Sequence, residues 1–234
     1  NKGEILETRP RPLIENLDSI PWPARDLLPL EKYFRIDIPM QSVSKRSPNI
    51  SFATSRGCPY RCTFCSSTIH WGGRLRTRSP EDVLNEMGHL ISEYGVRELK
   101  FEDDNLTFDV PRAKAIFQGM IDRGYDLTWN TPNGIAIWTL DDEMLELMKK
   151  SGCFELTLAI ESGDPWVLRN IVHKPLDLAD AEEAARRVKR HGIETTGYFI
   201  IGFPGETRQQ IKNTLRYARR LKLDKAYIFT FTPL

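Results

Sequence analysis

Three of the four cysteines in this 234-residue chain stand within eight residues of one another, as Cys58, Cys62 and Cys65. Their spacing is Cys-x3-Cys-x2-Cys, and the run follows directly on a strand-like segment. A four-iron four-sulfur cluster is normally held by four thiolates. Three thiolates on one short loop would hold three of its irons and leave the fourth open to a ligand that is not a protein side chain. The spacing therefore predicts an iron–sulfur cluster with one vacant iron.

A zinc ion is the main alternative for the same residues. Cys62-x2-Cys65 is also zinc-like spacing, and His70 could complete a set of four ligands. Structural zinc sites, however, usually combine two paired ligand sets, and no second pair occurs in the chain. Three cysteines without any ligand are the remaining interpretation. Cys153 stands apart, and we expect it to be a small buried side chain before a strand rather than a remote fourth ligand.

The composition excludes several classes of protein. Lys and Arg number 33 against 32 Asp and Glu, so the net charge of +1 gives no global field toward nucleic acid or an anionic membrane. The hydrophobic share of 40% excludes a disordered chain. No apolar run reaches the roughly 18 residues that a membrane span needs. Four cysteines are too few for a disulfide scaffold, and their clustering indicates a reducing compartment, so we expect a cytoplasmic protein.

Strand-like and helix-like segments alternate from residue 50 onward. The expected strands are Asn49–Ser55, Glu98–Glu102, Leu127–Asn130, Glu155–Ile160, Glu194–Ile201 and Ala226–Phe231, and the expected helices are 80–94, 110–123, 140–150, 178–191 and 207–222. Ser79-Pro80 is typical of a helix start, and Gly95 and Gly152 stand where helices should end. Such alternation predicts parallel strands joined by right-handed crossovers.

The number of these units decides between two architectures. Residues 50–234 divide into six units of about 31 residues, which is the length of one unit in an eight-unit barrel. The fourth expected strand also has two different faces, with Leu156, Leu158 and Ile160 on one and Thr157, Ala159 and Glu161 on the other. A central strand of a flat α/β sheet would be apolar on both faces. We therefore predict an α/β fold, an open partial (β/α)6 TIM-like barrel with parallel strands, rather than a doubly wound open sheet.

Residues 1–49 differ from the rest because they hold seven of the fifteen prolines. Proline fixes φ and cannot donate a ladder hydrogen bond, so this stretch should be extended and loop-like. We interpret residues 1–49 as a linker or N-terminal extension and residues 50–234 as the core domain. The chain ends on an expected strand, and we interpret it as a fragment of a longer protein.

The cysteine motif, with an aromatic side chain at Phe64 and its place after the first strand of a six-unit barrel, resembles the radical S-adenosylmethionine (SAM) superfamily. The resemblance covers about residues 50–234. It implies that SAM would chelate the open iron through its amino and carboxylate groups. It also implies that an electron, from a donor such as flavodoxin or ferredoxin, would cleave SAM to a deoxyadenosyl radical that abstracts a hydrogen from substrate.

The same resemblance assigns residues at two strand ends to SAM. Asp103 or Asp104, which follow the second strand, would hold the SAM amino group, in an acidic variant of the family's usual Gly-Gly-Glu type sequence. Glu161 and Ser162, which follow the fourth strand, would bind the ribose and carboxylate end. The plainer interpretations are that the Asp pair caps the next helix and that Glu161 and Ser162 form a turn.

Phe64 and Gly202 complete the implied SAM site. The backbone of Phe64 would meet the adenine edge, and the fifth-strand segment around Gly202 would flank the adenine. Packing of the aromatic ring and an ordinary strand-to-helix turn are the alternatives. We expect Lys174 to be solvated rather than paired with the SAM carboxylate, and the basic run Arg74–Arg78 to be a solvated loop.

The segment Leu17–Leu28 indicates a subgroup, because it resembles the linker that follows a cobalamin-binding domain in one large class of the superfamily. Many members of that class transfer a methyl group from methylcobalamin to carbon, and others form or rearrange rings. The resemblance implies a cobalamin-dependent radical methyltransferase or related enzyme that acts on a small molecule, with any cobalamin held by a domain outside this chain. The alternatives are a methylthiotransferase, whose second cluster would need cysteines that this chain lacks, and a zinc-stabilised binding module without catalysis.

Overall fold

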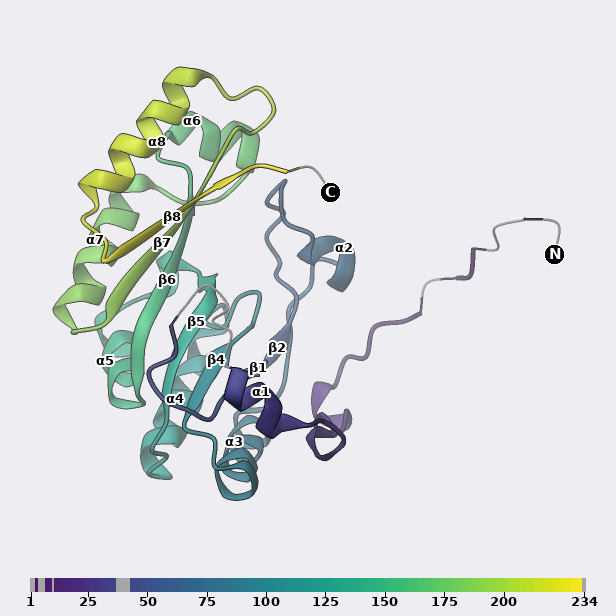
Figure 1. The fold of residues 1–234 in the computed structure, drawn as a ribbon. Helices are drawn as coiled ribbons and strands as arrows, with labels where there is room; N and C mark the ends of the chain where they lie inside the picture. Colours follow the sequence, from purple (N-terminus) through teal and green to yellow (C-terminus); the bar gives the residue numbers. More distant parts are fainter. Residues whose placement is uncertain (1–2, 4–6, 10, 37–42, 233–234) are drawn as a thin grey trace.

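Six parallel strands form the main sheet in the order β1, β4, β5, β6, β7 and β8 (Figure 1). The computed structural model describes residues 3, 7–9, 11–36 and 43–232. The six strands are Asn49–Phe52, Glu98–Phe101, Thr128–Ile135, Cys153–Glu161, Glu194–Ile201 and Lys225–Thr230. β1 and β8 are the two ends of this order, so the sheet does not close on itself. The predicted open partial barrel of six parallel strands is confirmed.

Helices connect consecutive strands and cover the outer face of the sheet (Figure 1). The long ones are α3 (Pro80–Tyr94), α4 (Val110–Asp122), α5 (Asp142–Lys150), α7 (Leu178–Arg190) and α8 (Arg208–Arg220). The short ones are α1 (Leu30–Ile36), α2 (Ser67–Trp71) and α6 (Pro165–Val167), with helical turns η1 (Leu17–Ser19), η2 (Arg25–Leu27), η3 (Ile137–Thr139) and η4 (Leu168–Val172). A two-stranded antiparallel pair, β2 (Ser55–Arg56) and β3 (Arg76–Thr77), follows β1. None of the helices in the described residues is long and apolar enough to cross a membrane.

The strand β6 has the two faces that its sequence predicted. Leu156, Leu158 and Ile160 are fully buried in the core between sheet and helices. Ala159 and Glu161, on the opposite face, line a cavity. A helix-covered apolar face and an inner face that accepts polar groups are what a partial barrel with a ligand in its interior requires.

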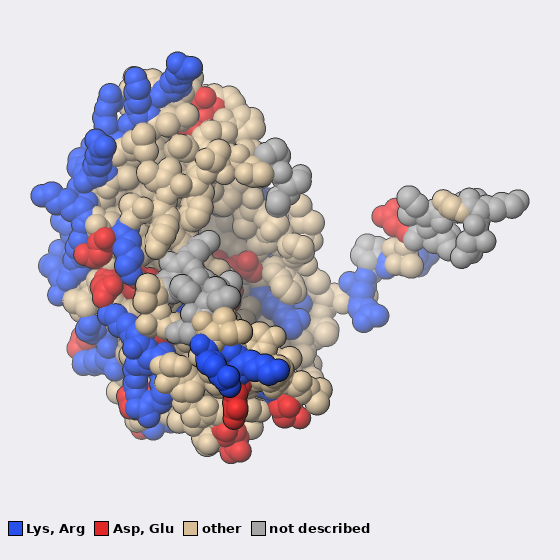
Figure 2. All heavy atoms as spheres, in the orientation of Figure 1, with Lys and Arg blue, Asp and Glu red and all other residues tan. Residues whose placement is uncertain are grey.

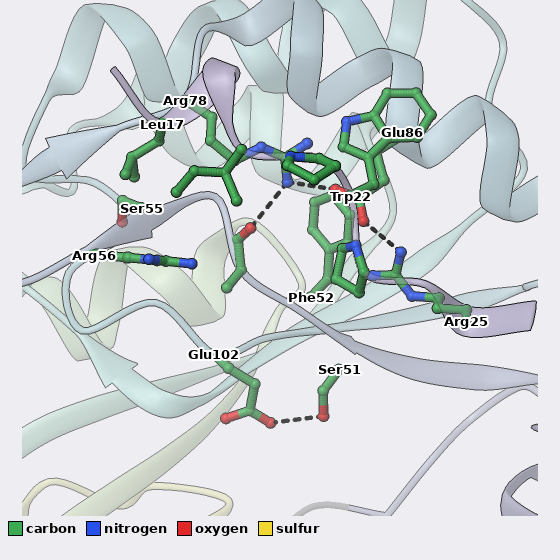
Figure 3. A pocket seen from close by; sticks show the side chains of 14 residues that line it. Leu17, Trp22, Arg25, Ser51, Phe52, Ser55, Arg56, Arg78, Glu86 and Glu102 are labelled. Atoms are coloured by element: carbon green, nitrogen blue, oxygen red, sulfur yellow. Dashed lines mark hydrogen bonds and ion pairs between the residues drawn. The ribbon is translucent and has the colours of Figure 1, made fainter. Parts of the chain in front are cut away.

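Part of the N-terminal segment packs beside β1 and α3 (Figure 3). Glu86 of α3 accepts hydrogen bonds from Arg25, at 2.5 Å, and from Arg78, and Trp22 Nε1 donates to Asp82 at 3.0 Å. These contacts enclose a cavity of about 300 Å³ between this segment and β1. The buried ion pairs fix the path by which the segment enters the core.

The expectation of a wholly extended N-terminal stretch is wrong for Leu30–Ile36, which forms α1. These seven residues contain no proline and follow Pro29, and proline just before or at a helix start removes a backbone donor that would have no partner there. Residues 1–2, 4–6, 10 and 37–42 of the predicted linker, and 233–234 of the core, lie outside the described residues.

A substitution at the start of β6 should measure how tightly the sheet is packed. Gly152 has a φ of +103°, and a Cβ there would overlap the carbonyl oxygen of Leu127. We expect Gly152→Ala to lower the free energy of unfolding by about 3 kcal/mol or more, as measured by urea titration. Gly124→Ala is the control, because Gly124 has a φ of +64° but open space around its Cβ, and should cost only about 1 kcal/mol. Equal losses would show that steric overlap at Gly152 is relieved without cost.

Candidate functional site

The loop between β2 and α2 carries the three clustered cysteines and is held from two sides. The Gly57 N–H donates to Asp104 Oδ2 at 3.0 Å, which ties the loop to the end of β4. Gly57 has a φ of +91°, and any Cβ there would overlap the carbonyl oxygen of Arg74. Thr63 donates to the carbonyls of Val172, at 3.1 Å, and Ile171, at 2.7 Å, which ties the other end of the loop to η4.

Cys58, Cys62 and Cys65 line one cavity of about 350 Å³ at the carboxyl ends of the strands. The ends of β4, β5 and β6 contribute further lining residues, among them Asp104, Asn105, Gly134, Ala159 and Glu161, and Lys174 joins them from the segment after η4. Active sites of parallel α/β barrels form at this end because the loops that follow the strands converge there. The volume lies in the range of a small-molecule or cofactor site.

Burial disfavours ionisation of two of the three thiols of this loop, those of Cys62 and Cys65. It raises the pKa of Cys62 to about 11, and it also raises the pKa of Cys65. The half-buried Cys58 Sγ accepts a hydrogen bond from Asn105 Nδ2 at 3.8 Å. Asn105 Oδ1 is buried without a hydrogen-bond partner among the described residues. Such thiols lose their protons when they bind a positively charged metal cofactor, which stabilises the thiolate form. The buried amide oxygen without a partner is also consistent with a site that a bound group completes.

Glu161 and Lys174 form a shielded ion pair at the same cavity, with Lys174 Nζ 3.0 Å from Glu161 Oε1. Glu161 has a φ of +70°, an uncommon conformation for a residue with a side chain, and it is 6% exposed. The expectation that Lys174 is solvated is wrong, because only 10% of its side chain is exposed. His173 takes a φ of +57°, and the Lys174 N–H then donates to Leu168 O, which folds this segment back over Glu161.

The ion pair gives a stability prediction. Lys174→Met leaves the Glu161 carboxylate buried without its partner, and we expect the free energy of unfolding to fall by about 3 kcal/mol. The double variant Lys174→Met with Glu161→Gln carries no buried charge there and should recover most of that loss. Urea titration of both variants checks this, and an equally large loss in both would mean that packing of the lysine stem, not the ion pair, stabilises the turn.

Three residues assigned to SAM by resemblance, Asp103, Ser162 and Gly202, do not line the cavity. Asp103 is 2% exposed and accepts hydrogen bonds from the backbone and hydroxyl of Thr54 and from Ser55. Burial raises its pKa, although these hydrogen bonds oppose the shift. Ser162 is fully buried, with its hydroxyl 3.0 Å from that of Thr214. Asp103 and Ser162 therefore brace the loops that carry the lining residues.

Asp104 and Phe64 do line the cavity, whereas Gly202 does not. The helix cap that was the alternative for the Asp pair belongs to Asp109, whose side chain accepts from Arg112 N at the start of α4. Gly202 has a φ of +83°, and its N–H donates to Glu206 at 2.6 Å in the turn that follows β7.

A second cavity of about 460 Å³ adjoins the first, and Phe64 and Glu161 line both. Its other wall includes Tyr198 and Phe229, whose rings meet edge to face with centroids 5.3 Å apart. The space at the carboxyl ends of the strands thus extends from the cysteine loop to the two last strands of the sheet.

Several lining residues escaped the sequence analysis because β5 runs further than expected, from Thr128 to Ile135. The predicted strand ended at Asn130, yet β5 continues past Pro132 with register shifts in its pairing with β6. Gly134, at a φ of +92°, approaches β6 so closely that a Cβ there would lie 2.8 Å from Ala159 Cβ. The glycine in an otherwise strand-like run was the available signal for close backbone approach.

The positions of His70 and Cys153 do not support the alternative ligand sets. His70 is exposed on α2 and does not line the cavity. Cys153 is 2% exposed at the start of β6, and burial raises its pKa well above the usual range, as expected for a small buried side chain. Across the described ranges, no three His, Cys, Asp or Glu side chains gather around a point where one metal ion would bind.

The open parallel sheet, with three cysteines lining a cavity at the carboxyl ends of its strands, defines a partial-barrel fold with a candidate site for a metal cofactor and a small molecule. Comparison with known families makes this specific, because the model of the radical SAM superfamily matches residues 52–218. The chain belongs to the radical SAM superfamily, whose enzymes use SAM together with a four-iron four-sulfur cluster.

Similar proteins are known from several organisms. The chain is 38% identical over 224 residues to cytidylyl-2-hydroxyethylphosphonate methyltransferase of Streptomyces wedmorensis, covering 93% of this chain and 42% of that protein. It is 36% identical over 231 residues to an uncharacterized methyltransferase of Pyrococcus horikoshii, covering 99% and 48%. The fold matches TsrM, a radical SAM methyltransferase of Kitasatospora setae with cobalamin and a [4Fe-4S] cluster bound, with a TM-score of 0.72 and 21% identity, covering 79% of this chain and 34% of that one. The chain spans less than half of each relative.

Proposed function

We propose that this chain is the core of a cobalamin-dependent radical SAM methyltransferase that acts on a small molecule. The observation that carries the proposal is the single cavity that joins three thiols to the Glu161–Lys174 ion pair at the carboxyl ends of the strands. The methyltransferase relatives support the reaction type, and cobalamin in the structure of TsrM supports the cofactor. The core domain would comprise residues 50–234, with residues 1–49 as the connection that precedes it.

The residues of the cavity divide into two groups by chemistry. Cys58, Cys62 and Cys65 would hold the iron–sulfur cluster, which supplies the electron that cleaves the sulfonium carbon–sulfur bond of SAM. Asp104, Glu161 and Phe64 would contact SAM, since they line the cavity beside the thiols. Lys174 orients the Glu161 carboxylate, whose free oxygen can accept hydrogen bonds from ribose hydroxyls.

Other residues would act by positioning and by excluding water. Asp103 and Ser162 hold the strand ends through their hydrogen bonds to Thr54 and Thr214. Trp138 Nε1 donates to Tyr60 Oη at 3.1 Å, and the two rings close one wall of the cavity. We also propose that the electron comes from a flavodoxin or ferredoxin, and that the protein works in a reducing compartment such as the cytoplasm, where the three thiols stay reduced.

Anaerobic reconstitution of the protein tests the proposal. We expect about four irons and four sulfides per chain, and SAM cleaved to 5′-deoxyadenosine when dithionite is added. With cobalamin and a substrate, methyl transfer should produce S-adenosylhomocysteine as well, because each methyl group taken from cobalamin must be replaced from SAM. One zinc per chain without SAM turnover would contradict the radical chemistry. Cleavage of SAM to 5′-deoxyadenosine without any S-adenosylhomocysteine, when cobalamin and substrate are both present, would contradict the methyltransferase assignment alone.

A further inference from the structure

Helix α8 carries an uninterrupted row of positive charge. Its 13 residues include no Asp or Glu, and Arg208, Lys212, Arg216 and Arg220 follow one another at intervals of four residues. All four are exposed, and Figure 2 shows blue atoms following this helix along the upper left edge of the molecule. The net charge of the whole chain is only +1, whereas α8 by itself carries five Arg or Lys side chains and no Asp or Glu.

Neighbouring carboxylates neutralise only one end of this row. Arg220 pairs with Glu182 of α7 at 2.7 Å, and Arg216 donates to the amide oxygen of Asn213 at 3.3 Å. Within the described residues, no ion pair involves Arg208 or Lys212. Like charges four residues apart on a helix repel and destabilise it. The row lowers the stability of the helix and, apart from its Arg220 end, forms no ion pair in the part of the chain that the structure describes. A role in binding an external anionic partner therefore explains it better than a role in stabilising the fold.

The inner face of α8 packs directly behind the SAM cavity. The Gly163 N–H donates to Thr214 Oγ1 at 3.0 Å, and Asn213 Nδ2 donates to Asp164 Oδ2 at 2.8 Å. These contacts hold the turn that follows Glu161, which lines the cavity. The outer, cationic face is therefore separated from that turn by about one helix diameter, roughly 10–12 Å.

The start of α8 also connects to the cysteine loop. Phe64, between Thr63 and Cys65, packs against Phe203 with ring centroids 6.2 Å apart. Phe203 lies four residues before Thr207, the N-cap of α8. The Arg208 end of the row thus follows, by five residues, a side chain that packs against the loop where the cluster is proposed.

We propose that the α8 row is the docking surface for an acidic protein that delivers single electrons to the cysteine loop. The inference rests on the proposed function, since reductive cleavage of SAM consumes one electron for each sulfonium carbon–sulfur bond broken. The donor is oxidised by one electron, and SAM gives methionine and a carbon-centred radical, with no proton transferred. Small, charge-steered contacts of this kind are typical of electron-transfer complexes, because the partner must bind quickly and leave again.

The surface chemistry favours an acidic protein over nucleic acid or a membrane. Binding of a single-stranded nucleic acid would use aromatic side chains on which bases stack, and a membrane would use exposed apolar ones. None of the large hydrophobic side chains exposed in the described residues lies on α8, because Tyr217 and Ala218 face inward. The outer face of α8 therefore presents cations without exposed large apolar side chains, and this charge complements the carboxylates on the surface of an acidic protein.

The test compares two triple variants that lower the net charge equally. Arg208→Gln/Lys212→Gln/Arg216→Gln removes the row, whereas Lys32→Gln/Arg97→Gln/Lys150→Gln removes exposed cations on α1, before β4 and at the end of α5. Binding of an acidic flavodoxin is measured by calorimetry at two salt concentrations, and SAM cleavage is driven either by the reduced flavodoxin or by dithionite. Glutamine keeps helix propensity, so circular dichroism should match that of the wild-type chain.

We expect the α8 variant to bind flavodoxin about 10-fold more weakly and to lose the salt dependence, while the control variant binds as the wild type does. Dithionite-driven SAM cleavage should be equal in all three proteins. Unchanged flavodoxin affinity in the α8 variant overturns the proposal. So does a loss of affinity for a 20-nucleotide RNA with flavodoxin binding intact, which would make the row a nucleic-acid surface. Failure of dithionite to drive cleavage in the wild-type chain would instead contradict the proposed function.

Discussion

Cys62→Ala is expected to abolish both the iron–sulfur cluster and SAM cleavage. Cys62 is the middle cysteine of the proposed ligand loop, and removal of its sulfur leaves two thiols, which could not hold three irons. Iron per chain should fall to background, the visible absorbance of the cluster should vanish, and formation of 5′-deoxyadenosine should drop by about 1000-fold or more. The fold should persist, because the loop is tied to Asp104 and η4 by hydrogen bonds that do not involve this side chain.

Cys153→Ala is the matched control for that experiment. Cys153 is the one cysteine outside the cluster, and it is buried at the start of β6 rather than at the cavity. Its replacement removes a small buried group, so we expect a loss of stability of about 1 kcal/mol with iron content unchanged. If Cys153→Ala also lost iron, the assignment of three ligands would be wrong.

Gly134→Val is expected to separate SAM binding from cluster binding. A Cβ at position 134 would lie 2.8 Å from Ala159 Cβ, and both residues line the cavity. The valine side chain must either fill the cavity or push β5 away from β6. We expect the dissociation constant for SAM to rise about 30-fold or more, while the three cysteines continue to bind iron. Equilibrium dialysis with labelled SAM, together with iron analysis, measures the two properties independently.

Gly205→Val controls for backbone strain in the same experiment. Gly205 has a φ of +84°, close to the +92° of Gly134, but nothing lies within 4 Å of its Cβ position and it does not line the cavity. The strain of a β-branched residue at positive φ is thus similar in both variants. SAM affinity should be nearly normal in Gly205→Val. If both variants bound SAM equally poorly, loss of stability rather than occupation of the cavity would be the cause.

Local sequence signals predicted most of the fold. The helix Pro80–Tyr94 begins and ends at the residues that Ser79-Pro80 and Gly95 indicated. The strand Glu194–Ile201 also has its predicted bounds. These features depend on neighbouring residues, such as a cap, a proline at the first turn or a run of β-branched side chains, so they can be read without knowledge of the fold. The errors fell where distant contacts decide, as in β5, which was expected to end at Asn130 but continues beside β6 to Ile135.

In the candidate site, too, neighbouring residues predicted some features and distant contacts decided others. The spacing of Cys58, Cys62 and Cys65 predicted the chemistry, because three thiols within eight consecutive residues must share one loop whatever the rest of the chain does. The sequence could not separate Asp103 from Asp104. They are adjacent, yet one is bonded to Thr54 and Ser55 while the other lines the cavity and accepts from Gly57.

By itself, then, the sequence determined the loop that carries the three cysteines, the alternation of strands and helices and the number of units, since each depends on residues close together in the chain. Only the tertiary structure decided that Lys174 is shielded beside Glu161, that Ser162 and Asp103 support the cavity from behind, and that α8 exposes its cations while its other face holds the turn after β6. Whether a charged side chain is buried or paired depends on residues that are distant in the sequence and become neighbours only in the folded chain. A local sequence pattern therefore cannot predict it.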